Sequence, residues 1–158
     1  METEQLAVAL EREHREIDEG IEAFTSTQGS AQARADALTR AMRALRRHIY
    51  LEETLLFPPL RAAGMVAPVF VMLREHGELW RTLDALDAKL GNDPDDMARE
   101  ICGELLAQLD RHNSKEEPIL YPQADTALDA AARATLTAFL ASGHTPEGWV
   151  CEGARGPA

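Results

Sequence analysis

The sequence predicts an all-α protein: an up-down-up-down bundle of four long helices, then a short fifth helix and an irregular C-terminal tail. Apolar residues recur with helical spacing along most of the chain, and few stretches alternate with the period of two that a strand needs. Aromatic residues make up only 5% of the sequence. Helices joined by short loops pack as antiparallel neighbours, which favours a bundle.

The first two helices are expected over about residues 3–24 and 32–57. Thr3 stands where an N-cap would lie, and the apolar residues of the first helix fall on one face. The turn-rich segment 25–30 separates the two helices. Pro58-Pro59 is expected to stop the second helix, because proline lacks the N–H that a helix interior uses.

The third helix is expected to begin near Pro68 and to end at Leu90, with Gly91 following it. Asn92-Asp93-Pro94 then caps the fourth helix, which runs to about Tyr121. Together these helices and the first two form a bundle over residues 3–122.

Pro118 and Asp125 are the residues that determine what we expect of the C-terminal helices. Pro118 lies inside the fourth helix, so we expect a local distortion there. Asp125 is expected to cap the fifth helix, over residues 125–142. Residues 143–158 form the tail.

Length and charge limit the class of protein. A chain of 158 residues suits a single domain, residues 1–158. The formal net charge of −11 argues against nucleic acid and anionic membrane surfaces as partners. Cys102 and Cys151 are too few for a disulfide framework, although one disulfide could form. The N-terminus does not resemble a signal peptide, so the expected location is cytoplasmic.

The two halves of the chain repeat at an offset of about 62 to 64 residues. His48-x-x-x-Glu52 aligns with His112-x-x-x-Glu116, and residues 10–14 align with residues 72–76. Each half is therefore predicted to be a helical hairpin, with one histidine on its first helix and His-x-x-x-Glu on its second. A pseudo-twofold axis would relate the two hairpins.

Six polar residues lie on the core-facing stripes of these helices: His14, His48, Glu52, His76, His112 and Glu116. A buried carboxylate without a partner costs several kcal/mol, which a bound cation removes. Imidazole nitrogen and carboxylate oxygen suit iron, zinc, copper or manganese. Six ligands exceed the needs of one tetrahedral zinc and fit two metals bridged by carboxylates. The competing interpretation is a metal-free core with His–Glu pairs.

Four residues lie close to these six in the sequence or on the same helices. Asp18, one turn after the first histidine, is either an extra ligand or a polar residue at the core boundary. Glu53 and Glu117 directly follow proposed ligands and are expected to point about 100° away, into solvent. Tyr121, which aligns with Phe57, is expected to pack in the core near the site.

Four further residues complete the candidates. Trp80 either fills the pocket near the histidines or controls access to the metals. Cys102 is expected to be a small core residue and His144 a surface histidine of the tail. Cys151 receives no role.

The pattern His14, His48-x-x-x-Glu52, His76, His112-x-x-x-Glu116 resembles the hemerythrin-like, HHE cation-binding domain over about residues 3–122. The resemblance implies a four-helix bundle that holds a non-haem di-iron centre bridged by oxide or hydroxide. It also implies that Glu52 and Glu116 bridge the metals and that the histidines are terminal ligands. Zinc or manganese would be alternative metals.

The sequence departs from oxygen-carrying hemerythrins, whose third helix carries His-x-x-x-His. Met72 and Trp80 stand four residues before and after His76 instead. The four-His, two-Glu set is similar to bacterial hemerythrin-like proteins linked to nitric oxide and oxidative stress. The resemblance implies binding or sensing of O2, NO or peroxide. A di-iron redox enzyme and an iron donor or buffer are the alternatives.

Overall fold

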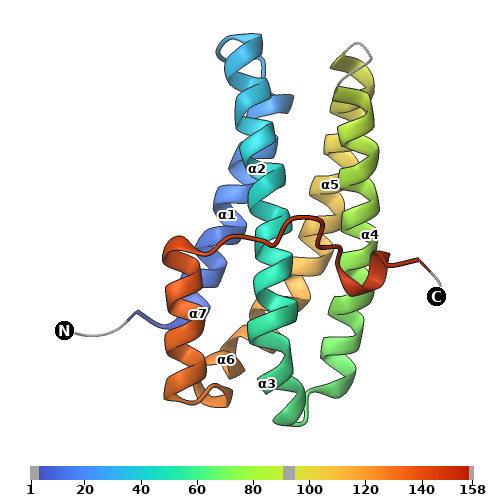
Figure 1. The fold of residues 1–158 in the computed structure, drawn as a ribbon. Coiled ribbons are helices and arrows are strands. Elements are labelled where there is room, and N and C mark those ends of the chain that lie inside the picture. The colour runs from blue at the N-terminus through green and yellow to red at the C-terminus, as the bar shows by residue number, and fades with distance from the viewer. Residues whose placement is uncertain (1–3, 91–94, 157–158) are drawn as a thin grey trace.

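The computed structural model describes residues 4–90 and 95–156, and every regular element in these ranges is helical. The first hairpin packs α1 against α2, and the second packs α4 against α5 (Figure 1). These helices are α1 (Leu6–Thr25), α2 (Ala31–Leu51), α4 (Val66–Leu90) and α5 (Asp95–Lys115). The predicted all-α bundle is confirmed. The caps proposed at Thr3, Gly91 and Asn92-Asp93-Pro94 lie outside the described residues.

Both α2 and α5 continue through a π-helical turn into a further short α-helix. The π turns are η1 (Glu52–Leu56) and η2 (Glu116–Leu120), and the short helices are α3 (Phe57–Ala62) and α6 (Tyr121–Ala127). The N–H of Phe57 donates to the carbonyl of Glu52, and that of Tyr121 to the carbonyl of Glu116. This five-residue spacing defines the wide turn.

Pro58 and Pro59 do not stop the second helix, contrary to the prediction, because the wide turn before them accommodates both rings. A proline ring clashes with the carbonyl four residues earlier in a regular α-helix. Here both prolines lie in the first turn of α3, where backbone N–H groups need no helical partner. The distortion predicted at Pro118 is confirmed, because this residue lies within η2.

The fifth helix, α7 (Ala130–Ser142), begins later than predicted and has a different cap. Since α6 carries the fourth helix past residue 125, Asp125 is helical itself and cannot start a new helix. The side chain of Asp129 accepts the N–H of Ala132 at 2.8 Å and caps α7. Asp125 instead accepts the N–H of Leu6 at 2.8 Å and so caps α1, the helix at the other end of the sequence.

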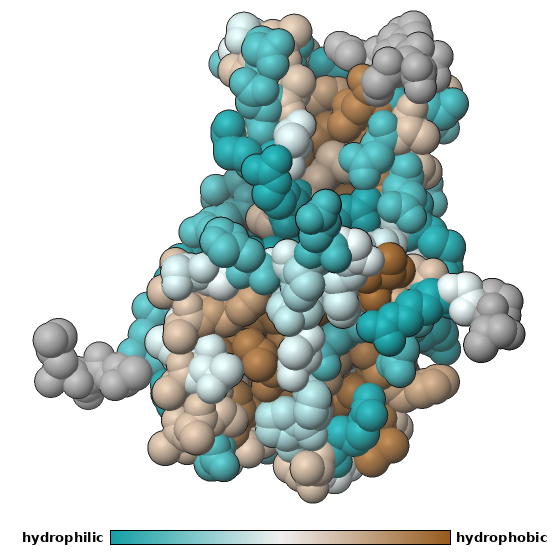
Figure 2. All heavy atoms as spheres, in the orientation of Figure 1, coloured by the Kyte–Doolittle hydropathy of each residue, from teal (hydrophilic) through white to brown (hydrophobic). Residues whose placement is uncertain are grey.

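The core consists of two apolar clusters with the six polar residues between them. Ile17 and Leu45 belong to the cluster nearer the hairpin turns, while Leu10 and Leu51 belong to the cluster around α3 and α6. His14 therefore lies between the clusters on α1. Figure 2 shows hydrophilic residues over most of the upper half of the visible face and more apolar residues in its lower half. Among the described residues no helix is long and apolar enough to cross a membrane.

The tail crosses the outside of α2 and reaches α4 (Figure 1). It is irregular, as predicted, apart from a short 3-10 helix, η3 (Glu152–Ala154), which packs on α4. Cys151 is buried in the first apolar cluster and Trp149 packs against that cluster. The tail is therefore packed on the bundle through Cys151, Trp149 and η3.

Candidate metal centre

The structure brings together all six residues that the sequence singled out. His14 comes from α1, His48 from α2, His76 from α4 and His112 from α5, while Glu52 and Glu116 are the first residues of the two π turns. None of the six is more than 4% exposed. These six side chains are therefore almost completely shielded from bulk water.

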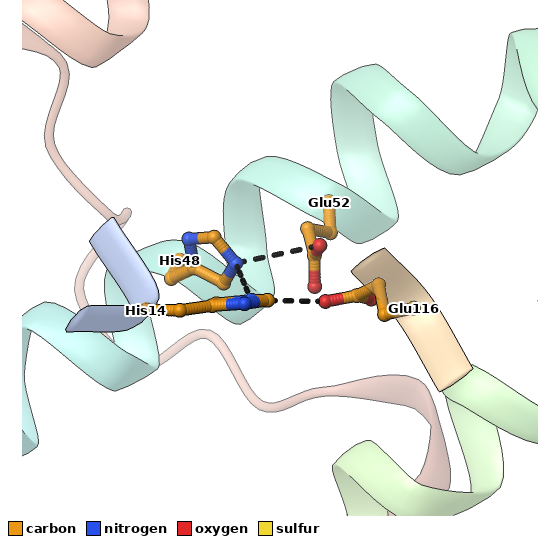
Figure 3. Close-up of side chains that lie close together, drawn as sticks. All are labelled: His14, His48, Glu52 and Glu116. Atoms are coloured by element: carbon orange, nitrogen blue, oxygen red, sulfur yellow. Dashed lines mark hydrogen bonds and ion pairs between the residues drawn. The ribbon is translucent and has the colours of Figure 1, made fainter. Parts of the chain in front are cut away.

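The six residues form two overlapping groups that could each hold a metal ion. The first group contains His14, His48, Glu52 and Glu116, and the second contains His76, His112 and the same two glutamates. Within each group the candidate ligand atoms lie within 4.8 Å of one another. Figure 3 shows the first group, in which the side chains from separate elements converge on one point.

Glu52 directs one carboxylate oxygen to each group. Its Oε2 lies 3.4 Å from Nε2 of His48, and its Oε1 lies 3.1 Å from Nε2 of His76. A carboxylate in this orientation can bind two cations at once.

Glu116 repeats the arrangement from the other hairpin. Its Oε1 lies 3.0 Å from Nε2 of His14, and its Oε2 lies 3.3 Å from Nε2 of His112. Each glutamate thus faces both groups, and the two glutamates occupy equivalent positions in the two hairpins, as the internal repeat predicts.

Each of the four histidines also contacts a second carboxylate through Nδ1, and we call these four residues the partner carboxylates. The contacts are His48 to Glu13 at 2.8 Å, His112 to Glu75 at 3.0 Å, His76 to Glu53 at 2.7 Å and His14 to Glu117 at 2.7 Å. A carboxylate accepts the Nδ1 proton and leaves Nε2, which faces the centre, as the nitrogen that can bind a metal.

The partner carboxylates correct one sequence prediction and add two residues that the sequence analysis missed. Glu53 and Glu117 were expected in solvent. The side chain of Glu53 is only 7% exposed, that of Glu117 is partly exposed at 36%, and both contact a histidine. Glu13 and Glu75 were not considered. The sequence feature that could have identified them is the dipeptide Glu-His, which occurs at residues 13–14 and again at 75–76. It repeats between the halves in the same way as the Glu-Glu pairs at 52–53 and 116–117.

The hydroxyl of Tyr121 lies inside the first group, although the sequence placed this residue only near the site. It donates to a carboxylate, with Oε2 of Glu52 at 2.7 Å and Oε1 of Glu116 at 2.8 Å, and Nε2 of His14 lies 2.8 Å away. Burial and the two carboxylate charges raise the pKa of Tyr121 well above its ordinary value. The corresponding Phe57 stacks on the ring of His76, so the two groups differ chemically.

Protonated imidazoles compensate the buried carboxylates when no metal is bound. Burial disfavours the charged form of His112, but the charge of Glu116 and the hydrogen bond to Glu75 outweigh burial and raise the pKa of His112 to about 10. Burial likewise opposes ionisation of Glu116, yet His112 and His14 hold its pKa well below the ordinary value. The six residues thus hold both signs of charge in the protein core.

The donor set fits a cation. Oε2 of Glu116 has no hydrogen-bond partner among the described residues, because the approach of His112 at 3.3 Å lacks hydrogen-bond geometry. A buried carboxylate oxygen without a donor is costly, and a metal ion would satisfy it. Four imidazole nitrogens and two carboxylates, each oriented by a neighbour, are the donors that iron, zinc and manganese accept.

A small cavity lies between the histidines and the first apolar cluster, with room for about one water-sized molecule. Its apolar lining consists of Ile17, Leu45, Ile49, Leu79 and Leu109. Asn113 also lines the cavity, is 9% exposed, and has an Oδ1 atom without a hydrogen-bond partner among the described residues. A ligand in this cavity would meet the histidines and Glu52, the apolar side chains and one amide.

The remaining candidates lie outside the two groups. Asp18 is half-buried, and burial raises its pKa to about 6, which suits a boundary residue. Trp80 is not among the cavity-lining residues and packs edge-on against Trp149 of the tail. Cys102 is buried in the first apolar cluster with its thiol free, and His144 is exposed, as predicted for both.

The chain matches the family model of the hemerythrin HHE cation-binding domain over residues 5–124. Searches of curated proteins and of solved structures give no significant match. The matched segment contains all six residues of the two groups and both π turns, and it spans more than half of the sequence. The chain therefore belongs to the hemerythrin HHE cation-binding domain family.

Proposed function

We propose that the protein holds two iron ions, one in each group, and that Glu52 and Glu116 bridge them. The observation that carries this proposal is the orientation of the two glutamates, each with one oxygen toward each histidine pair. His14 and His48 would be the terminal ligands of one ion, and His76 and His112 those of the other. Zinc and manganese accept similar donors, so metal analysis is part of the test.

We further propose that the centre binds or reacts with O2, NO or peroxide, as a sensing or stress-response protein. Bound iron would supply open coordination positions and electrons for such molecules. The chain limits the ligand to a few atoms, because the cavity beside the histidines is small. The Asn113 amide can hydrogen-bond a ligand there.

A di-iron redox enzyme is the second candidate, and the position of Tyr121 favours it. Its hydroxyl holds a proton within hydrogen-bond distance of both bridging glutamates, where a general acid would be needed. An iron donor or buffer receives less support, because all six proposed ligands are deeply buried and metal exchange would require the bundle to open.

The test is anaerobic loading of the purified protein with ferrous iron, followed by metal analysis and exposure to O2, NO and peroxide in turn. We expect two irons per chain and a change in the visible spectrum with at least one of these molecules. Two bound irons without any spectral change would contradict the proposed reactivity. Repeated turnover of peroxide or NO, as opposed to a single reaction, would identify an enzyme.

A further inference from the structure

The segment that crosses the bundle after α7, residues 144–156, contacts the surroundings of the metal centre at several points, and we call it the tail strap. It lies beyond the segment that matches the family model. Figure 1 shows it running across α2 and onto α4, the helix that carries His76.

The tail strap meets α4 by direct contact between backbones. A Cβ atom built on Gly153 would lie 2.5 Å from the carbonyl oxygen of Leu73, and one built on Gly77 would lie 2.5 Å from the carbonyl oxygen of Gly153. Neither position therefore has space for a side chain. Arg81 adds a hydrogen bond to the carbonyl of Gly153 at 3.1 Å.

The buried Cys151 and the partly buried Trp149 anchor the tail strap on the bundle. The thiol of Cys151 donates to the carbonyl oxygen of His76 at 3.6 Å. Trp149 packs edge-on against Trp80 and Tyr50, with ring centroids 5.5 and 5.0 Å apart. The strap thus has a defined position relative to the backbone of His76.

The tail strap also reaches the side chain of His76 through a partner carboxylate. The N–H of Glu152 donates to Oε1 of Glu53 at 3.0 Å, while Oε2 of Glu53 accepts from Nδ1 of His76 at 2.7 Å. For Glu13 and Glu75 this support comes from the second helix of each hairpin: Arg47 contacts Glu13 at 3.1 Å, and Lys115 contacts Glu75. For Glu53 the supporting donor comes from the strap.

We propose that the tail strap is a positioning element of the metal centre: the backbone N–H of Glu152 orients Glu53, and Glu53 fixes His76 for metal binding. This inference rests on the proposed metal pair. Partner carboxylates that orient a ligating histidine typically change metal affinity by about 10- to 100-fold. Displacing the strap should therefore weaken metal binding by the second group and leave metal binding by the first group nearly unchanged.

The test uses the full-length Gly153→Ala variant, whose new methyl group would meet the carbonyl of Leu73 and displace the strap. Gly156→Ala is the matched control, because a Cβ there meets nothing within 4 Å. Tryptophan fluorescence reports whether the strap has moved. We expect a chelator to remove one of the two irons about 10- to 100-fold faster from Gly153→Ala than from wild type, and no change in the control.

Two measurements separate positioning from a general loss of stability. In a Glu53→Ala background, Gly153→Ala should have no further effect on iron release, because the strap acts through Glu53. In the metal-free protein, ¹⁵N NMR should show a changed Nδ1 signal for His76 in Gly153→Ala and an unchanged signal for His112.

Displacement of the strap with wild-type iron release, or an equal effect with and without Glu53, would overturn the inference. Wild-type protein that fails to bind two metals would overturn the proposed function instead. The NMR comparison on metal-free protein would still decide whether the strap orients His76.

Discussion

The hydroxyl of Tyr121 lies 2.7 Å from Oε2 of Glu52, on the side of the site that belongs to the first group. In a regular α-helix, a residue five positions after Glu116 would lie about 140° around the axis. The π turn η2 brings Tyr121 over Glu116 instead. The equivalent turn η1 places Phe57 against His76, so the two proposed metal positions are inequivalent.

Replacement of Tyr121 by Phe should destabilise the metal-free protein and slow its reaction with peroxide after iron loading. A buried carboxylate loses its hydroxyl donor, which should lower the free energy of unfolding by about 1–3 kcal/mol. Loss of a general acid should slow the reaction about 100-fold, while both irons still bind. Denaturant unfolding, metal analysis and stopped-flow absorbance measure these effects.

The matched control is Tyr50→Phe, because Tyr50 contacts Phe139 and Trp149 outside the site. A Tyr121→Phe protein that reacts with peroxide at the wild-type rate would rule out the proposed proton donation.

Loss of a bridging glutamate should remove more metal than loss of a terminal histidine. Glu116→Gln is expected to lose most of both irons, because Glu116 faces both groups. His112→Ala is expected to retain about one iron per chain, because His112 belongs to one group. Metal analysis after desalting distinguishes the two variants, and circular dichroism checks that each remains helical. Equal iron content in both would argue against bridging by Glu116.

Removal of a partner carboxylate should weaken metal binding without removing a ligand. Glu75→Ala leaves Nδ1 of His112 without its acceptor, so iron affinity should fall by about 10- to 100-fold. Chelator competition gives the affinity. Glu78→Ala, an exposed position on the same helix, is the control and should behave as wild type. Similar affinities of the two variants would show that Glu75 has no orienting role.

The stability of the metal-free protein should fall as the pH rises above neutrality. The pKa of His112 is raised from 6.5 to about 10, so the folded state binds its proton more tightly than the unfolded state. The contribution of this proton is fully present below pH 6.5 and is lost as the pH passes through about 10. Denaturant unfolding of metal-free protein between about pH 6 and 10 checks the direction.

Iron affinity should have the opposite dependence on pH. A metal must displace the protons of the imidazoles, so binding tightens as the pH rises over the same range. Chelator competition at several pH values measures this slope. A pH-independent affinity would mean that the histidines are already deprotonated in the metal-free protein or do not bind the metal.

The sequence predicted the six proposed ligands because histidines and glutamates on apolar stripes, repeated in both halves, are costly in a core that binds no cation. It could not predict the partner carboxylates in the same way. Glu53 and Glu117 follow the ligands by one residue and fall on the solvent side of a helical wheel, yet their long side chains reach a histidine of a neighbouring helix. That contact depends on how two helices pack, which periodicity does not contain.

The helix ends were harder to predict for a related reason. Pro58-Pro59 stops a regular helix, but a π turn just before it removes the clash, and hydrophobic periodicity does not distinguish one wide turn from a break. Asp125 has the composition of an N-cap, and its partner turned out to be Leu6, 119 residues away in the sequence. Only the assembled bundle identifies that partner.

The cap that Asp125 provides to α1 has a consequence for biosynthesis. The first helix leaves the ribosome 119 residues before the carboxylate that completes its N-terminal turn. A nascent chain therefore carries an uncapped first helix until nearly the whole bundle has been translated. A fragment that ends at residue 124, where the family match ends, would keep every proposed ligand and still have a frayed beginning.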